Sequence, residues 1–152
     1  MPIDHDLICQ LYGPHTEQRE VQTRFNRLIS SYKECFSPSP GEPLMLFSTP
    51  GRTELGGNHT DHNHGRVLAA SVHLDTIGAV SPREDSQVFL ISEGYPQVHV
   101  DISSTEYRKD EEGTTEALVR GIADYFSSAG VHLKGFQAWT TSSVLKGSGL
   151  SS

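Results

Sequence analysis

The sequence contains few of the features that mark specialised classes of protein. Only two of its 152 residues are cysteines, Cys9 and Cys35, and no C-x-x-C pair occurs. We therefore expect buried or idle thiols in preference to a disulfide or a zinc pair. No apolar run approaches the ~20 residues that span a bilayer, and the acidic N-terminus lacks the long apolar stretch of a secretory signal. These absences predict a cytoplasmic protein with no membrane partner.

Basic charge is also scarce. The chain has 12 lysines and arginines against 19 aspartates and glutamates, which gives a formal net charge of −7. This balance argues against a nucleic-acid partner or an anionic membrane, since both require a positive field. ATP remains compatible with it, because phosphate sites are local and are often built from backbone N–H groups. The length suits one domain with a moderate core.

Two stretches have the apolar spacing of amphipathic helices. Residues 15–36 place their apolar side chains on one face, and the prolines within 38–43 end this helix. Residues 114–129 form a second such stretch, and Gly130 follows where a C-terminal glycine is common. We expect residues 108–113, which precede it, to form a charged and exposed loop.

Several shorter stretches have the composition and alternation of β-strands. They are residues 44–49, 67–74, 76–80, 87–92, 97–102 and 136–143. The fourth and fifth flank the turn residues Glu93-Gly94-Tyr95-Pro96, which predicts a hairpin. Because helices and hairpin strands are mixed without a regular alternation, the sequence predicts an α+β fold.

Two polar segments are candidates for chemistry. The first, residues 48–68, follows an expected strand and combines arginine, aspartate, histidines, asparagines and glycines, so we expect a ligand-binding loop. The second, residues 145–152, is rich in glycine and serine and also follows a strand. Glycines let backbone N–H groups turn toward a phosphate, and serines add hydroxyl donors. It is not a Walker motif, because no Lys-Ser or Lys-Thr pair closes it.

In their order and separation, the two segments resemble the galactokinases, a branch of the GHMP family of small-molecule kinases. The likeness lies in Pro50-Gly51-Arg52, Asn58-His59-Thr60-Asp61, Gly65-Arg66-Val67-Leu68 and the glycine-rich tail. The resemblance implies the N-terminal domain of a GHMP kinase, a ribosomal protein S5 domain 2-like fold with helices packed on a mixed sheet. Residues 1–152 would form part of that domain, truncated at the phosphate-binding loop, with its remainder and the C-terminal domain absent.

The resemblance also implies roles for individual residues. Arg52 matches the catalytic arginine, and the sugar-binding positions are Asn58, His59, Thr60 and Asp61. The start of the ATP loop corresponds to Lys146, Gly147, Ser148, Gly149, Leu150, Ser151 and Ser152. The implied reaction converts galactose to galactose 1-phosphate with ATP and Mg²⁺. We expect the base and the magnesium ligands to lie beyond this chain, so that the chain alone is inactive.

Three alternatives stay open at this stage. Asn58 stands where the family has glutamate, so the sugar could be galactose, a related hexose or an amino sugar. The complete protein could also be a sugar sensor that binds both ligands without turnover. A third possibility is a metal-binding module formed by His59, His62, His64 and Asp61, since zinc accepts imidazole and carboxylate ligands.

Overall fold

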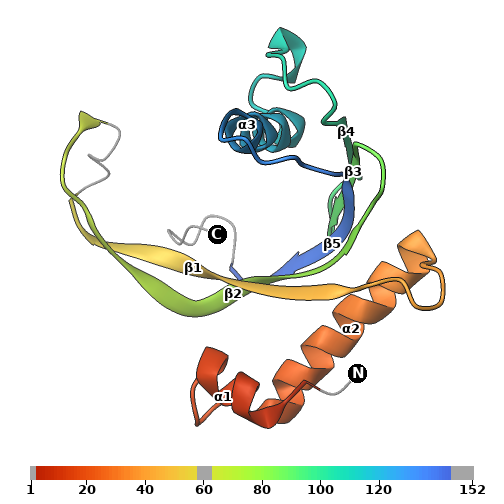
Figure 1. The fold of residues 1–152 in the computed structure, drawn as a ribbon. Coiled ribbons are helices and arrows are strands. Elements are labelled where there is room, and N and C mark those ends of the chain that lie inside the picture. The colour runs from red at the N-terminus through yellow and green to blue at the C-terminus, as the bar shows by residue number, and fades with distance from the viewer. Residues whose placement is uncertain (1–2, 58–62, 145–152) are drawn as a thin grey trace. The chain divides into compact units, whose positions relative to one another are not determined.

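The computed structural model describes residues 3–57 and 63–144 (Figure 1). The elements in chain order are α1 (His5–Tyr12), α2 (Gln18–Phe36), β1 (Met45–Gly56), β2 (Leu68–Pro82), β3 (Gln87–Ser92), β4 (Val98–Asp101), the 3₁₀ helix η2 (Lys109–Glu111), α3 (Thr115–Ser128) and β5 (Phe136–Ser142). None of the helices within these ranges combines the length and the apolar character needed to cross a membrane.

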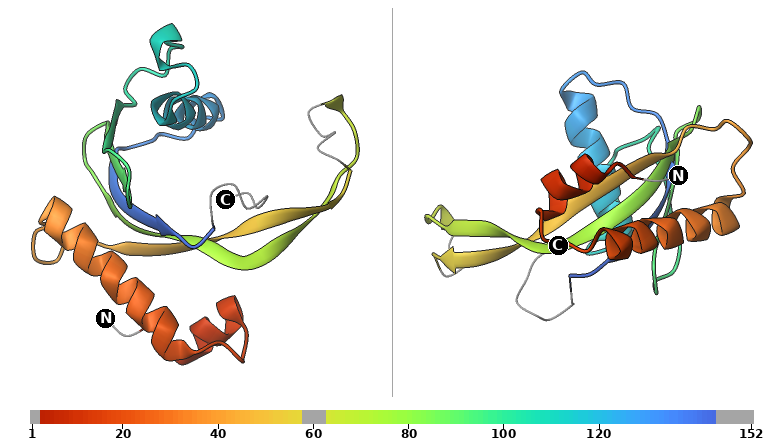
Figure 2. Two further views of the ribbon diagram at one scale, coloured as in Figure 1. Left: turned by 180° about the vertical axis from the view of Figure 1, so that it is seen from behind. Right: turned by 90° about the horizontal axis from the view of Figure 1, so that it is seen from below.

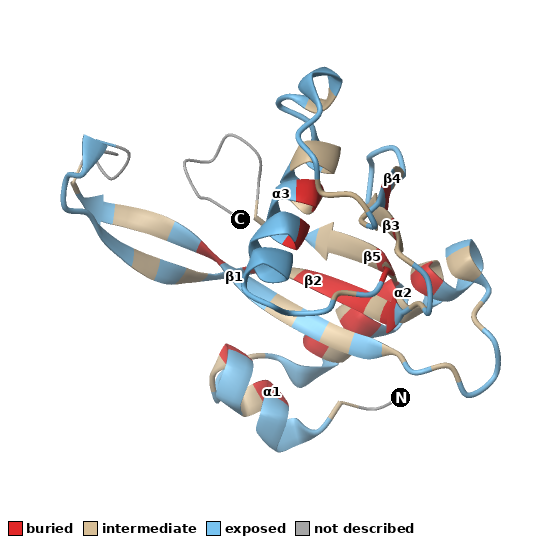
Figure 3. Ribbon diagram, turned by 45° about the horizontal axis from the view of Figure 1, so that its top comes forward, coloured by how far each residue is buried: buried red, intermediate tan, exposed pale blue. Residues whose placement is uncertain are grey.

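Both predicted helices are present, and a third helix precedes them. The apolar face of α2 is buried, as its spacing predicted (Figure 3). Helix α3 begins after Thr114, whose hydroxyl accepts a hydrogen bond from the N–H of Ala117, and Gly130 follows it with φ of 81°. Helix α1 was not predicted. Its eight residues are capped by Asp4, which accepts from the N–H of Asp6, and such a cap allows a short helix to form.

The five strands form a mixed sheet in the order β1-β2-β5-β3-β4. Strands β3 and β4 pair antiparallel, with Val88 opposite Val100, so the predicted hairpin is confirmed. Strands β3 and β5 pair in parallel, with Val88 opposite Phe136. Helix α3 comes between β4 and β5 in the chain and packs against β4. Together β4 and α3 form the long connection that the parallel pair β3 and β5 requires. The α+β class with a mixed sheet is confirmed.

The strands around the first polar segment are longer than predicted. Strand β1 continues through Gly56, so the first nine residues of the expected loop 48–68 are strand. Pro50 is compatible with this strand because β1 lies at the edge of the sheet, where proline is tolerated. Strand β2 is continuous from Leu68 to Pro82, in place of the two separate strands that we predicted.

The chain divides into two compact units. The first comprises 1–31, 47–78 and 141–152, and in it α1 and α2 contact the long ribbon formed by β1 and β2 (Figure 2). The second comprises 32–46 and 79–140, with α3 against the sheet. Buried apolar side chains in the first unit are Ile8, Tyr12, Val21, Phe25, Leu28 and Ile77; in the second they are Tyr32, Ala79, Val88, Val100, Ala123 and Ala138.

Candidate functional site

Arg52 lies within strand β1, and not in a loop as predicted. Its residue is exposed, while the preceding Gly51 is buried. The Arg52 side chain forms no hydrogen bond or ion pair with any other residue in the described ranges. A strand holds its backbone more firmly than a loop does, and within the described part of the chain no residue occupies the donors of this guanidinium.

Glycine is required where β1 ends. Gly57 has φ of 119°, and a Cβ added there would lie 2.7 Å from the carbonyl oxygen of Arg66 and from Cα of Val67. The chain leaving β1 therefore approaches the chain that enters β2 more closely than any side chain permits. This contact fixes the two ends of the segment that contains the predicted sugar-binding residues.

Most of the predicted site residues lie outside the described ranges. These are Asn58, His59, Thr60 and Asp61 of the sugar-binding motif and all of Lys146 to Ser152 in the glycine-rich tail. His62 and two other members of the possible metal cluster fall in the same gap, whereas His64 is described and exposed with φ of 61°. Within 3–57 and 63–144 no group of three histidine, cysteine, aspartate or glutamate side chains could hold a metal.

A buried carboxylate, Asp75, organises the polar interior of the first unit. Only 4% of the residue is exposed. Its Oδ2 accepts hydrogen bonds from the hydroxyl of Tyr12 at 2.5 Å and from Oγ of Ser48 at 2.7 Å. Its Oδ1 accepts from Nη2 of Arg24 at 2.7 Å, an ion pair. Helix α1, helix α2 and strand β1 each contribute one donor to this single side chain.

The ionisation of this group follows from its partners. Burial raises the pKa of Asp75, but hydrogen bonds from Tyr12, Arg24 and Ser48 outweigh it, so the net pKa is lowered. Burial and the hydrogen bond to Asp75 raise the pKa of Tyr12 to about 12. At neutral pH the site therefore holds a carboxylate, a guanidinium and a neutral phenol.

Asp75 falls between the two predicted strands, 67–74 and 76–80, and no role was predicted for it. One signal pointed to it: an aspartate within an apolar strand must be paired, because charged residues are almost never buried alone. The partners could not be identified in the same way. Tyr12 lies 63 positions and Arg24 51 positions away in the chain, and Tyr12 belongs to a helix that was not predicted.

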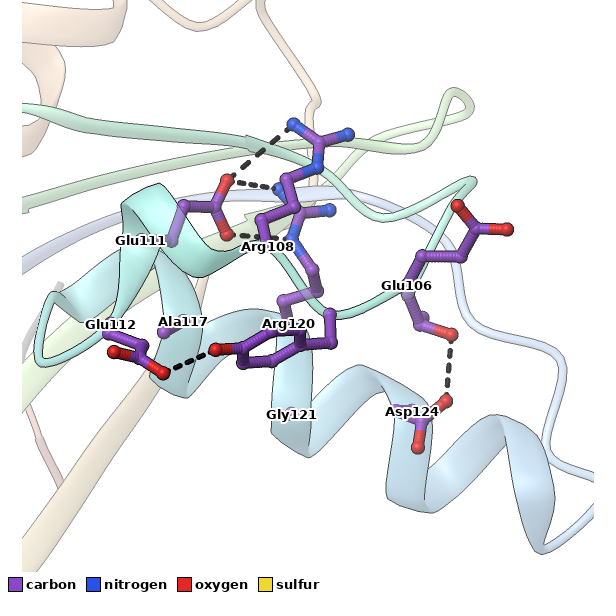
Figure 4. Close-up of a pocket in the computed structure, with 10 residues that line it drawn as sticks. Glu106, Arg108, Glu111, Glu112, Ala117, Arg120, Gly121 and Asp124 are labelled. Carbon is purple, nitrogen blue, oxygen red and sulfur yellow. Dashed lines mark hydrogen bonds and ion pairs between the residues drawn. The ribbon is translucent and has the colours of Figure 1, made fainter.

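A hollow with a volume of about 430 Å³ lies in the other unit, between the segment 105–112 and helix α3 (Figure 4). At its base the buried Arg120 donates to both carboxylate oxygens of Glu111 at 2.8 Å each, and to the carbonyls of Asp101 and Ser104. Four of the five N–H donors of the guanidinium are occupied within the protein, so this arrangement is structural. Residues 108–110, 112 and 113 are exposed, as predicted, whereas Glu111 is partly buried, and residues 109–111 form a 3₁₀ turn.

Comparison with known proteins identifies the family. The model for the galactokinase galactose-binding signature matches residues 30–82, which include Arg52 and the sugar-binding motif. The human galactokinase is 38% identical over 138 residues, covering 86% of this chain, and a galactokinase of Lactococcus lactis is 33% identical over 135 residues. The chain belongs to the galactokinase family. It spans about a third of the length of these relatives, 35% and 33% respectively.

The folds agree with this assignment. The crystal structure of Lactococcus lactis galactokinase complexed with galactose superposes with a TM-score of 0.71 at 32% identity, over 85% of this chain and 33% of that one. The mevalonate kinase of Methanococcus jannaschii superposes with a TM-score of 0.54 at 15% identity, over 73% of this chain and 36% of that one. At that identity the second likeness concerns the fold alone. The galactokinase-like chain thus has the fold of the GHMP kinases.

Proposed function

We propose that the complete protein is a sugar kinase that transfers the γ-phosphoryl group of ATP to galactose, giving galactose 1-phosphate. The observation that carries the proposal is the match of residues 30–82 to the galactose-binding signature. The likeness to a galactokinase complexed with galactose supports it. Residues 1–152 would be the N-terminal part of the kinase N-terminal domain.

In this proposal Arg52 acts on the reacting groups. Phosphoryl transfer depends mainly on positioning and on stabilising charge, and a fixed guanidinium beside the attacking hydroxyl supplies both. The exposed side chain on a regular strand, without a partner among the described residues, suits this role. The planar group carries its charge at every physiological pH.

The sugar and the nucleotide would bind to the two motifs that frame the domain. Asn58, His59, Thr60 and Asp61 would hold the sugar hydroxyls, and the carboxylate of Asp61 can accept from two of them. Residues 146–152 would begin the cradle for the ATP phosphates. Magnesium, when bound with ATP, neutralises charge on the phosphates. The described residues offer no cluster that would ligate it, so we assign no magnesium ligand to them.

The test uses the complete reading frame that encodes this chain. ATP consumption is measured with a panel of hexoses for the wild type and for Arg52→Ala. We expect galactose-dependent turnover that falls at least a hundredfold in the variant, since one transition-state donor contributes about 10²–10³ in rate. The matched control is Arg19→Ala, which removes an exposed arginine from α2 outside both motifs and should leave turnover unchanged.

Each other outcome has a definite meaning. Galactose binding without turnover would contradict the kinase and favour the sugar sensor. Turnover with a different sugar would locate the change in specificity at Asn58, and Asn58→Glu should then restore galactose. No response to any sugar, together with equimolar bound zinc, would favour the histidine-rich metal module. We also expect no turnover from the 152-residue chain alone, because it spans only a third of its relatives' length.

A further inference from the structure

Helix α3 has two apolar sides, and the described part of the chain covers only one of them (Figure 3). On the covered side Ala123 is buried and Val119 is partly buried. A helix at the surface of a soluble protein usually turns polar residues toward water on its other side. Helix α3 instead exposes four large apolar side chains there: Leu118 by 63%, Ile122 by 51%, Tyr125 by 72% and Phe126 by 43%.

These four side chains form one continuous strip, which we call the α3 stripe. Leu118, Ile122 and Phe126 follow one another at intervals of four residues, and Tyr125 lies three positions after Ile122, so all four share one face of the helix. An apolar groove of about 260 Å³ adjoins the stripe, and Ile122 and Phe126 line it together with side chains from β3 and β5. A contiguous apolar patch of this kind is often an interaction surface.

The size of the α3 stripe indicates which kind of contact can cover it. A large apolar side chain presents about 200 Å², so four that are on average a little more than half exposed leave roughly 450 Å² to be covered. A stable interface between two separate proteins buries about 800 Å² on each partner. Separate proteins must also offset the translational and rotational freedom that they lose on association, whereas a segment of the same polypeptide does not. The stripe therefore suits an intramolecular contact better than a dimer.

The relatives of this chain indicate where such a segment would come from. The chain spans only 35% and 33% of the length of the two galactokinases described above. A complete protein of their length would contribute about two thirds of its residues from outside 1–152.

We propose that an apolar segment from that further part of the complete protein packs on the α3 stripe and fills the adjoining groove. The inference rests on the proposed function only in taking the complete protein to have the length of its relatives. Neither the identity of the sugar nor turnover enters it. A complete protein without turnover would therefore refute the proposed function and leave the inference intact.

The first test compares three tyrosines in the complete wild-type protein. Tyr95, Tyr107 and Tyr125 are all exposed in this structure, by 60%, 73% and 72%, and a phenol ring has the same intrinsic reactivity toward hydroxyl radicals at each position. We expect oxidation of Tyr125, measured by mass spectrometry, to be at least fivefold slower than that of the controls Tyr95 and Tyr107 at every protein concentration. A smaller difference would refute the inference, and protection that disappears on dilution would show that a second copy covers the stripe instead.

The second test identifies the covering segment. The aromatic photo-cross-linker p-benzoylphenylalanine is placed at position 125 of the complete protein, and at the exposed position 95 as the control. We expect illumination to link position 125 to a peptide outside residues 1–152 of the same molecule, with at least fivefold less product from position 95.

The other cross-linking results would each contradict the inference. They are a link to a peptide within 1–152, a cross-linked dimer, no link from position 125, or a yield from position 95 within fivefold of that from position 125. If the protein with the cross-linker at position 125 fails to fold, oxidation of the wild type still decides.

Discussion

Replacement of Arg120 by lysine should destabilise the second unit strongly, although the charge is retained. The guanidinium, with 5% of its side chain exposed, makes four hydrogen bonds: two to Glu111 and one each to the carbonyls of Asp101 and Ser104. An ammonium group is a single donor centre and cannot match the paired geometry of the carboxylate while reaching both carbonyls. At least two bonds are lost, each with a net contribution of about 1–1.5 kcal/mol.

We therefore expect Arg120→Lys to lower the free energy of unfolding by about 2–3 kcal/mol, a shift in the urea midpoint of about 1 M. The matched control is Arg108→Lys. Arg108 also pairs with Glu111, at 3.5 Å, but 46% of its side chain is exposed, so its loss should cost at most about 1 kcal/mol. Urea unfolding followed by circular dichroism measures both. Equal midpoints for the two variants would show that the reasoning from burial and bond geometry is wrong.

Two further predictions concern packing and ionisation. Gly121→Ala should stabilise the protein by about 0.5–1 kcal/mol, because the position is helical and nothing lies within 4 Å of the new methyl group. Gly135→Ala should destabilise it by about 1–3 kcal/mol, because the new Cβ would lie 2.2 Å from the carbonyl oxygen of Gln87. Thermal melting compares the two variants, and a Gly135→Ala variant as stable as the wild type would contradict the predicted overlap. The pKa of Asp75 is lowered in the folded protein, so the stability it contributes should be complete above about pH 4 and be lost as the pH falls below that value. The pKa of Tyr12 is raised to about 12, so the stability it contributes should be complete below about pH 10 and be lost between about pH 10 and 12. The free energy of unfolding, measured against pH, should show both losses, and Tyr12→Phe should abolish the loss at alkaline pH. If the alkaline loss is unchanged in this variant, its assignment to Tyr12 is wrong.

Local patterns were enough to predict most elements. The apolar spacing of α2 and α3, the glycine after α3 and the alternation of β3 are properties of neighbouring residues, which the chain order records directly. The family likeness was also visible, because Arg52 and the residues that follow it form a contiguous motif. These features depend on residues only a few positions apart, so they could be recognised without the tertiary structure.

Long-range partners were decided by the tertiary structure. The strand β1 continues past its apolar residues because β2 pairs with it, and Arg52 therefore lies on a strand in place of a loop. The sequence did not reveal the partners of Asp75 or the burial of Arg120, and both residues are buried because each gathers donors or acceptors from distant segments. Burial of a charge becomes favourable only when all its partners are in place, and no local pattern records which residues the fold will bring together.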